Sequence, residues 1–230
     1  MEIRKLDWDS DFFGLQIGRV DLQTLDDAVD LALMHYDLKY QYDLLYVFSK
    51  DGLSFDAIGA DLVDEKVLYS KMCEKREKCK DVMLYGLQKP TEPMYNLALV
   101  SGEFSRFRLD KRLPEGSYEH LYRKWIENAC PREGSNKRIL AYVEDDIPRG
   151  MITVDYNGDH AQIGLVAVDS KCQHQGIGTK IMSSLERGLF EEGVMTIDVA
   201  TQKANKDACR WYEKNGFKVK SITPIYHWWL

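Results

Sequence analysis

Hydrophobic and polar positions follow two different patterns within the first 88 residues. Between Asp26 and Met34, acidic residues in a first turn precede apolar positions spaced three or four apart, which predicts a helix. The segment 42–48 is mostly apolar and predicts a buried strand. Residues 1–88 are therefore predicted to form a small α/β domain.

Two prolines, Pro90 and Pro93, mark the end of this part. Because proline disfavours both a helix interior and a central strand, the segment 89–93 is the best linker candidate. We place a domain boundary there and expect a second domain over residues 94–230.

The second part mixes strand-like and helix-like patterns. Apolar segments separated by turn-forming residues predict consecutive antiparallel hairpins, and amphipathic segments before and after them predict helices. The expected fold class is α+β, with a mixed sheet that carries helices on its faces. The expected strands are 96–100, 138–144, 151–156, 161–168 and 196–199, with final strands around Phe217 and Tyr226, and the expected helices are 118–128, 176–190 and 206–214.

Composition and charge narrow the classes of partner. The chain has 230 residues, of which 44% are hydrophobic and 30% charged, as in ordinary soluble globular proteins. Its 31 Lys and Arg against 37 Asp and Glu give a net charge of −6. Because an acidic surface repels phosphate backbones, we expect no nucleic acid partner.

Five cysteines are scattered along the chain without a Cys-x-x-Cys pair. This pattern predicts reduced thiols in a cytoplasmic protein and no metal site. No apolar run approaches the ~20 residues that a membrane-spanning helix needs, and the acidic N-terminus lacks the apolar segment of a signal peptide. We therefore expect neither export nor a membrane span.

The most informative segment leads from an apolar strand into a helix through two close glycines. It reads Gln173-His174-Gln175-Gly176-Ile177-Gly178-Thr179. A helix N-terminus here would offer unpaired amide hydrogens and the positive end of the helix dipole, with no Cβ at either glycine to keep a phosphate away. The segment is either an anion cradle or a plain tight turn, and it matches neither a dinucleotide fold nor a P-loop.

Two motifs in this part of the chain resemble the GNAT superfamily of acyl-CoA-dependent N-acyltransferases. Residues 173–178 match its Arg/Gln-x-x-Gly-x-Gly/Ala pyrophosphate loop, and residues 205–217, from Asn205 through Tyr212 to Phe217, match its second motif. The resemblance covers about residues 95–230. It implies a mixed sheet splayed between its fourth and fifth strands, with the pantetheine arm of acetyl-CoA in the gap.

Acyl transfer from a thioester to an amine needs a neutral amine, a donor for the developing oxyanion and a proton for the departing thiolate. The phenol of Tyr212, with an ordinary pKa of about 10, suits the last role without large tuning. The resemblance implies that Tyr212 is the general acid and that Asn205 binds the pantetheine; a Tyr packed in an amphipathic helix is the alternative. The backbone of Val166, Ala167 and Val168 would align the pantetheine, and His174 would face a phosphate or the solvent.

The sequence leaves the general base open. The candidates are ordered water and four side chains that no spacing argument separates: Tyr226, His227, Glu119 and Asp155. Cys172 and Cys209 lie near the two motifs, but burial in the core is the common fate of cysteine.

A second resemblance extends over nearly the whole chain. The segments 6–14, 17–19, 104–110 and 121–126 are similar to the bacterial TDP-fucosamine acetyltransferases, which N-acetylate a nucleotide-linked 4-amino-4,6-dideoxy sugar for cell-envelope glycans. It implies such a sugar as the small-molecule amine substrate. Arg106 and Arg108 either pair with its phosphates, since Arg presents a matching fork, or form surface salt bridges.

Two other functions stay open. One is a GNAT enzyme that acetylates another small-molecule amine or a protein amine, and the other is a non-catalytic CoA-binding module. The intact Tyr212 and Asn205 argue against the second. The aromatic segment 226–230 is compatible with a homodimer contact, a substrate wall or burial in the core.

Overall fold

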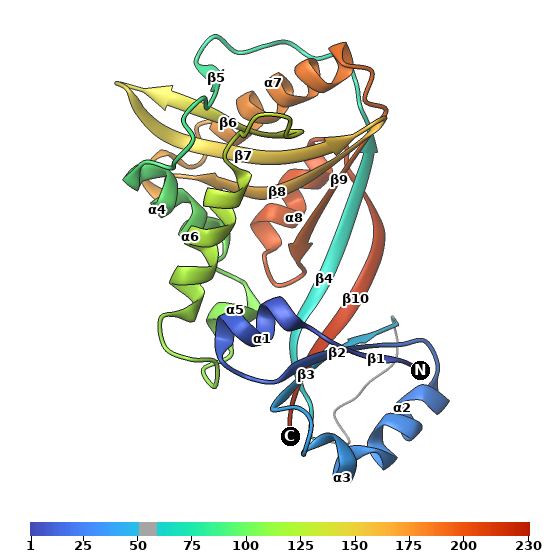
Figure 1. Ribbon diagram of the computed structural model, residues 1–230. Coiled ribbons are helices and arrows are strands. Elements are labelled where there is room, and N and C mark those ends of the chain that lie inside the picture. Colours follow the sequence, from blue (N-terminus) through green and yellow to red (C-terminus); the bar gives the residue numbers. More distant parts are fainter. Residues whose placement is uncertain (51–58) are drawn as a thin grey trace.

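The strands pair into one mixed sheet in the computed structural model, which describes residues 1–50 and 59–230 (Figure 1). Their order across the sheet is β1-β2-β3-β10-β4-β9-β8-β7-β6-β5. The pairs β2–β3 and β8–β9 are parallel, and the other neighbours are antiparallel. The strands are β1 (Ile3–Lys5), β2 (Ile17–Leu22), β3 (Leu44–Ser49), β4 (Asp61–Met72), β5 (Val82–Leu84), β6 (Lys137–Glu144), β7 (Ile147–Asn157), β8 (His160–Val168), β9 (Thr196–Gln202) and β10 (Lys218–Trp229).

Helices cover both faces of the sheet (Figure 1). Helices α7 and α8 pack on one face of β4, β7, β8 and β9, whereas α1, α4, α5 and α6 cover the other face. Helices α2 and α3 cover β2, β3 and β10 on the side away from α1 and α5. None of the described helices is both long and apolar enough to cross a membrane. The helices are α1 (Asp7–Phe13), α2 (Leu25–Leu33), α3 (His35–Leu38), α4 (Glu92–Ser101), α5 (Arg106–Leu109), α6 (Ser117–Ala129), α7 (Ile177–Glu191) and α8 (Lys206–Lys214).

Most of the expected elements are present, but the segment 96–100 is helical rather than a strand. It lies within α4, whose first turn contains Pro93. Proline is tolerated in a first turn because the amide hydrogen that it lacks would have no helical acceptor there. The buried residues Met94, Leu97 and Ala98 follow the three-to-four spacing of one helix face. The prolines therefore begin a helix at the place where the sequence predicted a linker.

The sheet also crosses the predicted boundary between residues 1–88 and 94–230. Strand β4 comes from the first range, yet it lies between β9 and β10 of the second. Strand β5, also from the first range, pairs with β6, and β10 returns to pair with β3. The division into two domains stays a prediction, and the two ranges share one sheet.

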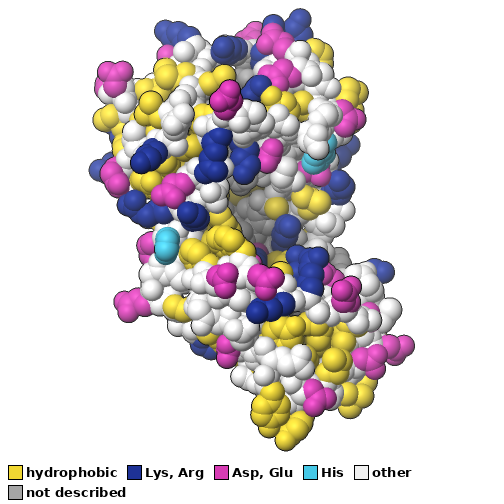
Figure 2. Space-filling model, viewed as in Figure 1, with side chains coloured by type: hydrophobic (Ala, Val, Ile, Leu, Met, Phe, Trp, Pro, Cys, Tyr) yellow, Lys and Arg dark blue, Asp and Glu magenta, His cyan; other side chains and the backbone are white. Residues whose placement is uncertain are grey.

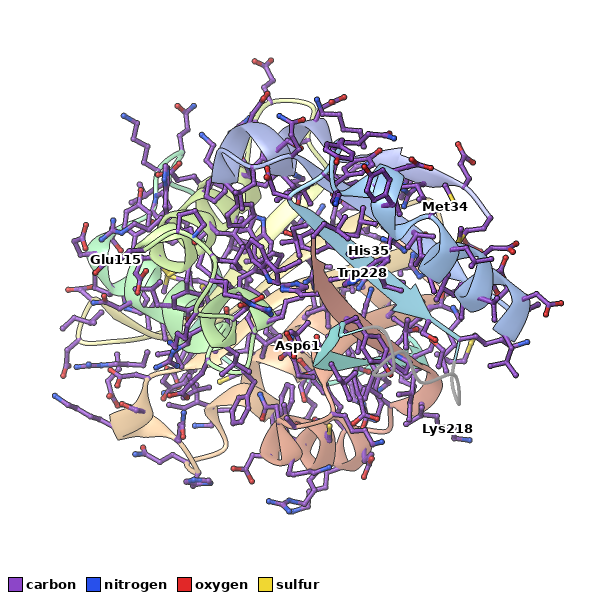
Figure 3. The ribbon with its side chains drawn as sticks, turned by 90° about the horizontal axis from the view of Figure 1, so that it is seen from below. Met34, His35, Asp61, Glu115, Lys218 and Trp228 are labelled. Atoms are coloured by element: carbon purple, nitrogen blue, oxygen red, sulfur yellow. The ribbon has the colours of Figure 1, made fainter. Side chains whose placement is uncertain are left out.

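The C-terminal aromatic segment is part of the core. Tyr226, His227 and Trp228 are at most 3% exposed. Figure 3 shows Trp228 beside His35 of α3, and their rings stack with centroids 5.3 Å apart. Of the three roles that the sequence allowed for residues 226–228, burial in the core is the observed one.

A buried ion pair connects β4 to the two helices on its face. The Lys71 ammonium lies 2.9 Å from the Glu186 carboxylate of α7, and both side chains are 3% exposed. Lys71 also donates a hydrogen bond of 2.9 Å to the backbone oxygen of Asn215, directly after α8. The pair therefore fixes the C-terminal end of α8 relative to α7 and the sheet.

Removing one partner of this pair leaves the other charge buried and unpaired. We expect Glu186→Ala to lower the free energy of unfolding by about 3 kcal/mol or more, measured by urea denaturation. Glu191→Ala, which removes a solvent-exposed pair with Arg187 on the same helix, is the matched control and should cost less than about 1 kcal/mol. Equal losses in the two variants would show that the buried pair does not anchor the helices.

Candidate active site

The sheet opens between β8 and β9. These strands pair from His160 to Ile163 opposite Thr196 to Val199, and their pairing stops there although both strands continue. Beyond that point Val166, Ala167 and Val168 pair only with β7. A bulge marks the change, because Gly164 and Leu165 together face Thr153, whose hydroxyl accepts a hydrogen bond from the Leu165 amide at 2.7 Å. Strands β8 and β9 are therefore splayed beyond Ile163 and Val199, as the resemblance implied.

The glycine loop, residues 173–178, leads into the N-terminus of α7 and has unpaired amides. Gly176 has a φ of +77° and His174 a φ of +62°, so the chain turns sharply before the helix. The amides of residues 175–179 donate no hydrogen bond to an acceptor in the described ranges, and no side chain caps the helix. A Cβ on Gly176 would meet no atom within 4 Å. The loop thus presents consecutive donors and a helix dipole to open space, which suits a phosphate.

The second glycine of the loop serves helix packing. A Cβ on Gly178 would lie 3.2 Å from the indole ring of Trp211 on α8. The Trp211 indole in turn donates a hydrogen bond of 3.3 Å to the hydroxyl of Thr179. Gln173 and Ile177 also have structural contacts, since Gln173 donates to the Val168 carbonyl and Ile177 is 4% exposed. Gly178 therefore lets α7 and α8 approach each other beside the loop.

Tyr212 of α8 lies on the face of the sheet that α7 also covers. It is 4% exposed, and its ring contacts those of Tyr69, Trp211 and Phe217. Its hydroxyl has no hydrogen-bond partner among the residues that the structure describes. Burial raises the pKa of Tyr212 well above its ordinary value, which makes the phenol a weaker acid than the sequence suggested. The phenol is protonated at neutral pH.

Asn205 begins α8 as its N-cap. Its side-chain oxygen accepts a hydrogen bond of 3.1 Å from the Ala208 amide. The oxygen is therefore committed to the helix, and the side-chain NH₂ group is the part that can reach a ligand. Cys209 packs nearby with its thiol 3.7 Å from the Gln202 carbonyl, and Cys172 is half-buried, so both cysteines have packing contacts.

The two arginines of the second resemblance point to different environments. The Arg106 guanidinium packs over the rings of Tyr46 and Phe107, with its carbon 5.1 Å and 4.2 Å from their centroids. Its Nε is fully buried without a partner. Arg108 is exposed and pairs with Glu103 at 3.4 Å. Arg108 therefore forms a surface salt bridge, whereas the Arg106 side chain points into the protein.

The four side chains considered as general base lie on different parts of the fold. His227 is fully buried, hydrogen-bonded to Asp110 at 2.7 Å, and burial lowers its pKa. Tyr226 is buried in the cluster with α2 and α3. Glu119 is exposed in the first turn of α6, and Asp155 is exposed near the opposite end of β8, across from Gln162.

A further carboxylate, which no sequence motif marks, interacts electrostatically with Arg106. Asp64 of β4 is half-buried opposite Ile225, two residues from Lys66, which pairs with Gln202 at the end of β9. Burial raises the pKa of Asp64 to about 6, against the opposing effect of the Arg106 charge. No local motif marks Asp64, because its position follows only from the insertion of β4 next to β9.

The molecular surface is hollowed between two parts of the sheet. Figure 2 shows a hollow between the part that carries β6–β9 and the part that carries β1–β3, with Lys and Arg side chains gathered along its rim. Within the described ranges, no group of three or more His, Cys, Asp or Glu side chains could hold a metal ion. The site thus combines a loop of unpaired amides, a buried phenol and a polar hollow next to the splayed strands.

Comparison with known proteins identifies the same region. The model of the acetyltransferase (GNAT) family matches residues 97–217, which include both motifs. A dTDP-fucosamine acetyltransferase of Escherichia coli O6:H1 is 30% identical over 135 residues, which span 57% of this chain and 55% of that relative.

Solved structures share the fold at low sequence identity. A GCN5-related N-acetyltransferase from Sphaerobacter thermophilus has a TM-score of 0.61 at 12% identity and covers 99% of this chain and 76% of its own. The PaiA N-acetyltransferase from Thermoplasma acidophilum, solved in complex with coenzyme A, has a TM-score of 0.51 at 18% identity and covers 65% of this chain and 99% of its own. Since the family model spans more than half of the chain, the chain belongs to the GNAT family of acetyltransferases, whose acyl donor is acetyl-CoA.

Proposed function

We propose that this protein transfers the acetyl group of acetyl-CoA to the amine of a nucleotide-linked 4-amino-4,6-dideoxy sugar. The observation that carries the proposal is the run of unpaired amides at residues 175–179 beside the opening between β8 and β9. The acceptor class rests on the likeness to the dTDP-fucosamine acetyltransferase. The reaction would take place in the cytoplasm, where the five free cysteines stay reduced.

The residues present fit acetyl-CoA. The amides of residues 175–179 would hold its diphosphate, and the free edge of Val166–Val168 together with the Asn205 NH₂ group would hold its pantetheine arm. When bound, acetyl-CoA supplies an activated thioester carbonyl and a thiolate leaving group. The unpaired amide edge of β8 would donate a hydrogen bond to the carbonyl oxygen as negative charge develops on it.

Two side chains would move the protons. Asp64 would accept a proton from the acceptor amine, whose nitrogen then forms the new N–C bond as the C–S bond breaks. Tyr212 would give its hydroxyl proton to the departing sulfur. Because Tyr212 is protonated at neutral pH and Asp64 has a pKa of about 6, both groups are in the required protonation state above pH 6.

A panel of acceptors tests the proposed reaction. Release of CoA and mass of the product would be measured with nucleotide amino sugars, free amino sugars, polyamines and peptides. We expect the nucleotide-linked 4-amino-4,6-dideoxy sugars to give the highest kcat/KM and a product heavier by one acetyl group. A faster polyamine or peptide would assign another acceptor, and no acetylated product from any amine would favour a CoA-binding module.

Gly176→Ala tests the phosphate loop. The substitution places a Cβ in the open space before α7 and strains the backbone at a φ of +77°. We expect the Kd for CoA, measured by calorimetry, to rise about tenfold or more, the scale of one lost charge-assisted hydrogen bond. Gly188→Ala, on the same helix and also without close neighbours, should leave the Kd unchanged. The same Kd in both variants would argue against binding at this loop.

Tyr212→Phe tests the general acid. Loss of the hydroxyl should lower kcat about 100-fold, because proton transfer by a positioned group contributes on that scale, with the Kd for CoA unchanged. Tyr69→Phe is the matched control, since the Tyr69 ring contacts Tyr212 and its hydroxyl bonds Glu213 instead. Full turnover by Tyr212→Phe would exclude the hydroxyl from the reaction.

The pH dependence of kcat/KM tests Asp64. A carboxylate accepts a proton only above its pKa, so kcat/KM should rise as the pH passes through about 6. Asp64→Asn should remove this rise and lower kcat/KM about 100-fold, whereas Asp155→Asn should preserve the profile. If Asp64→Asn retained the wild-type profile, another group or water would be the base.

A further inference from the structure

Arg106 has no direct ion pair in the described chain, although the charges of Asp64 and Asp9 act on it. Its guanidinium lies among the rings of Tyr46, Phe48 and Phe107, and its Nε is fully buried without a hydrogen-bond acceptor. It forms no ion pair with a carboxylate of the described chain. A buried cation without a direct ion pair is costly, and an anionic ligand next to it would offset part of that cost.

Two further cations lie on the same side of the sheet. The Arg19 guanidinium of β2 stacks 3.6 Å from the centroid of Phe48, and the Arg106 guanidinium lies 5.9 Å from the same centroid. Lys66 of β4 is exposed and has no ion pair or hydrogen bond within the described chain. Burial, followed by the nearby charges of Arg106 and Arg19, lowers the pKa of Lys66, whereas the charge of Asp64 acts in the opposite direction.

A cavity joins Arg19, Phe48 and Lys66, and Arg106 lies next to Phe48 just outside the lining. The volume of the cavity is about 440 Å³, and Arg19, Phe48, Lys66 and Thr223 are among the residues that line it. Arg19 is partly compensated by Asp21, to which its Nε donates at 3.0 Å. The charges of Asp64 and Asp9 act on Arg106. The groove therefore has acidic groups near Arg106 and a cation without an ion pair at Lys66, a distribution that suits a ligand with both an amine and phosphate groups.

The groove adjoins the opening of the sheet. Lys66 pairs with Gln202, the last residue of β9, at a level where β8 has already separated from β9. A ligand in the groove would thus lie on the side of β9 opposite the free edge of β8.

We propose that Arg106, Lys66 and Arg19 form the subsite for the diphosphate of the acceptor, with Phe48 as its apolar floor. This assignment rests on the proposed function, because it takes the acceptor to be a nucleotide-linked amino sugar. It gives the chain a second phosphate site, separate from the amides of residues 175–179.

Calorimetry with dTDP as the probe tests the subsite independently of turnover. The protein would first be saturated with CoA, so that the loop at residues 175–179 is occupied. We expect dTDP to bind, thymidine to show no measurable binding, and pyrophosphate to compete with dTDP. Added salt should weaken dTDP binding, because the contacts are between charges.

Substitutions locate the site. Lys66→Ala and Arg106→Lys should each raise the Kd for dTDP about tenfold or more, the scale of a lost charge-assisted hydrogen bond, with the Kd for CoA unchanged. Arg106→Lys keeps the buried charge while removing the planar fork, and circular dichroism would check that it folds. Lys218→Ala is the control, since Lys218 is exposed at the other end of β10 (Figure 3).

The outcomes separate the subsite from the proposed function. If Lys66→Ala weakens dTDP binding but no nucleotide amino sugar is acetylated, the subsite stands and the proposed acceptor is wrong. If nucleotide amino sugars are acetylated with an unchanged KM in both Lys66→Ala and Arg106→Lys, the proposed acceptor stands and this subsite is wrong. Absence of dTDP binding to the CoA-saturated protein would also overturn the subsite.

Discussion

The interrupted pairing between β8 and β9 is the constraint on which the site depends. Two neighbouring parallel strands hydrogen-bond over four residue pairs and then separate, which leaves the edge of residues 166–168 without a neighbouring strand on that side. Unpaired backbone is costly when it is buried, so the opening persists only because other contacts hold its walls. The bulge at Gly164 and Leu165 turns β8 away, and the Lys71–Glu186 pair holds α7 and α8 against β4.

The segments that carry the proposed reactive groups adjoin the same opening. The loop that leaves β8 leads directly into α7, so the amides of residues 175–179 lie at the end of the free edge. Helix α8 follows β9 and carries Tyr212, while β4 pairs with β9 on its other side and carries Asp64 and Lys66. The unpaired amides, the protonated phenol and the carboxylate thus come from the neighbouring strands β8, β9 and β4 or from the segments that follow them.

Local sequence signals predicted the parts of this site that a short segment determines by itself. The glycine loop and the segment 205–217 could be found because turn, helix start and cap are set by neighbouring residues. The segment 96–100 was misjudged because its apolar run suits both a strand and a helix, and the capping position of Thr91 and Pro93 decides for the helix. Asp64 and Lys66 could not be found, because the pairing of β4 between β9 and β10 joins residues more than 130 positions apart. Arg106 and Arg108 differ only through the packing of α5 on Tyr46 and Phe107.

A crystal structure of the protein with CoA would show whether the cofactor occupies the opening between β8 and β9. We expect diphosphate oxygens within hydrogen-bond distance of the amides of residues 175–179, the pantetheine arm between β8 and β9, and the CoA sulfur next to the Tyr212 hydroxyl. A CoA molecule bound elsewhere, or a sulfur separated from Tyr212 by the closed ring cluster of Tyr69, Trp211 and Phe217, would contradict this expectation.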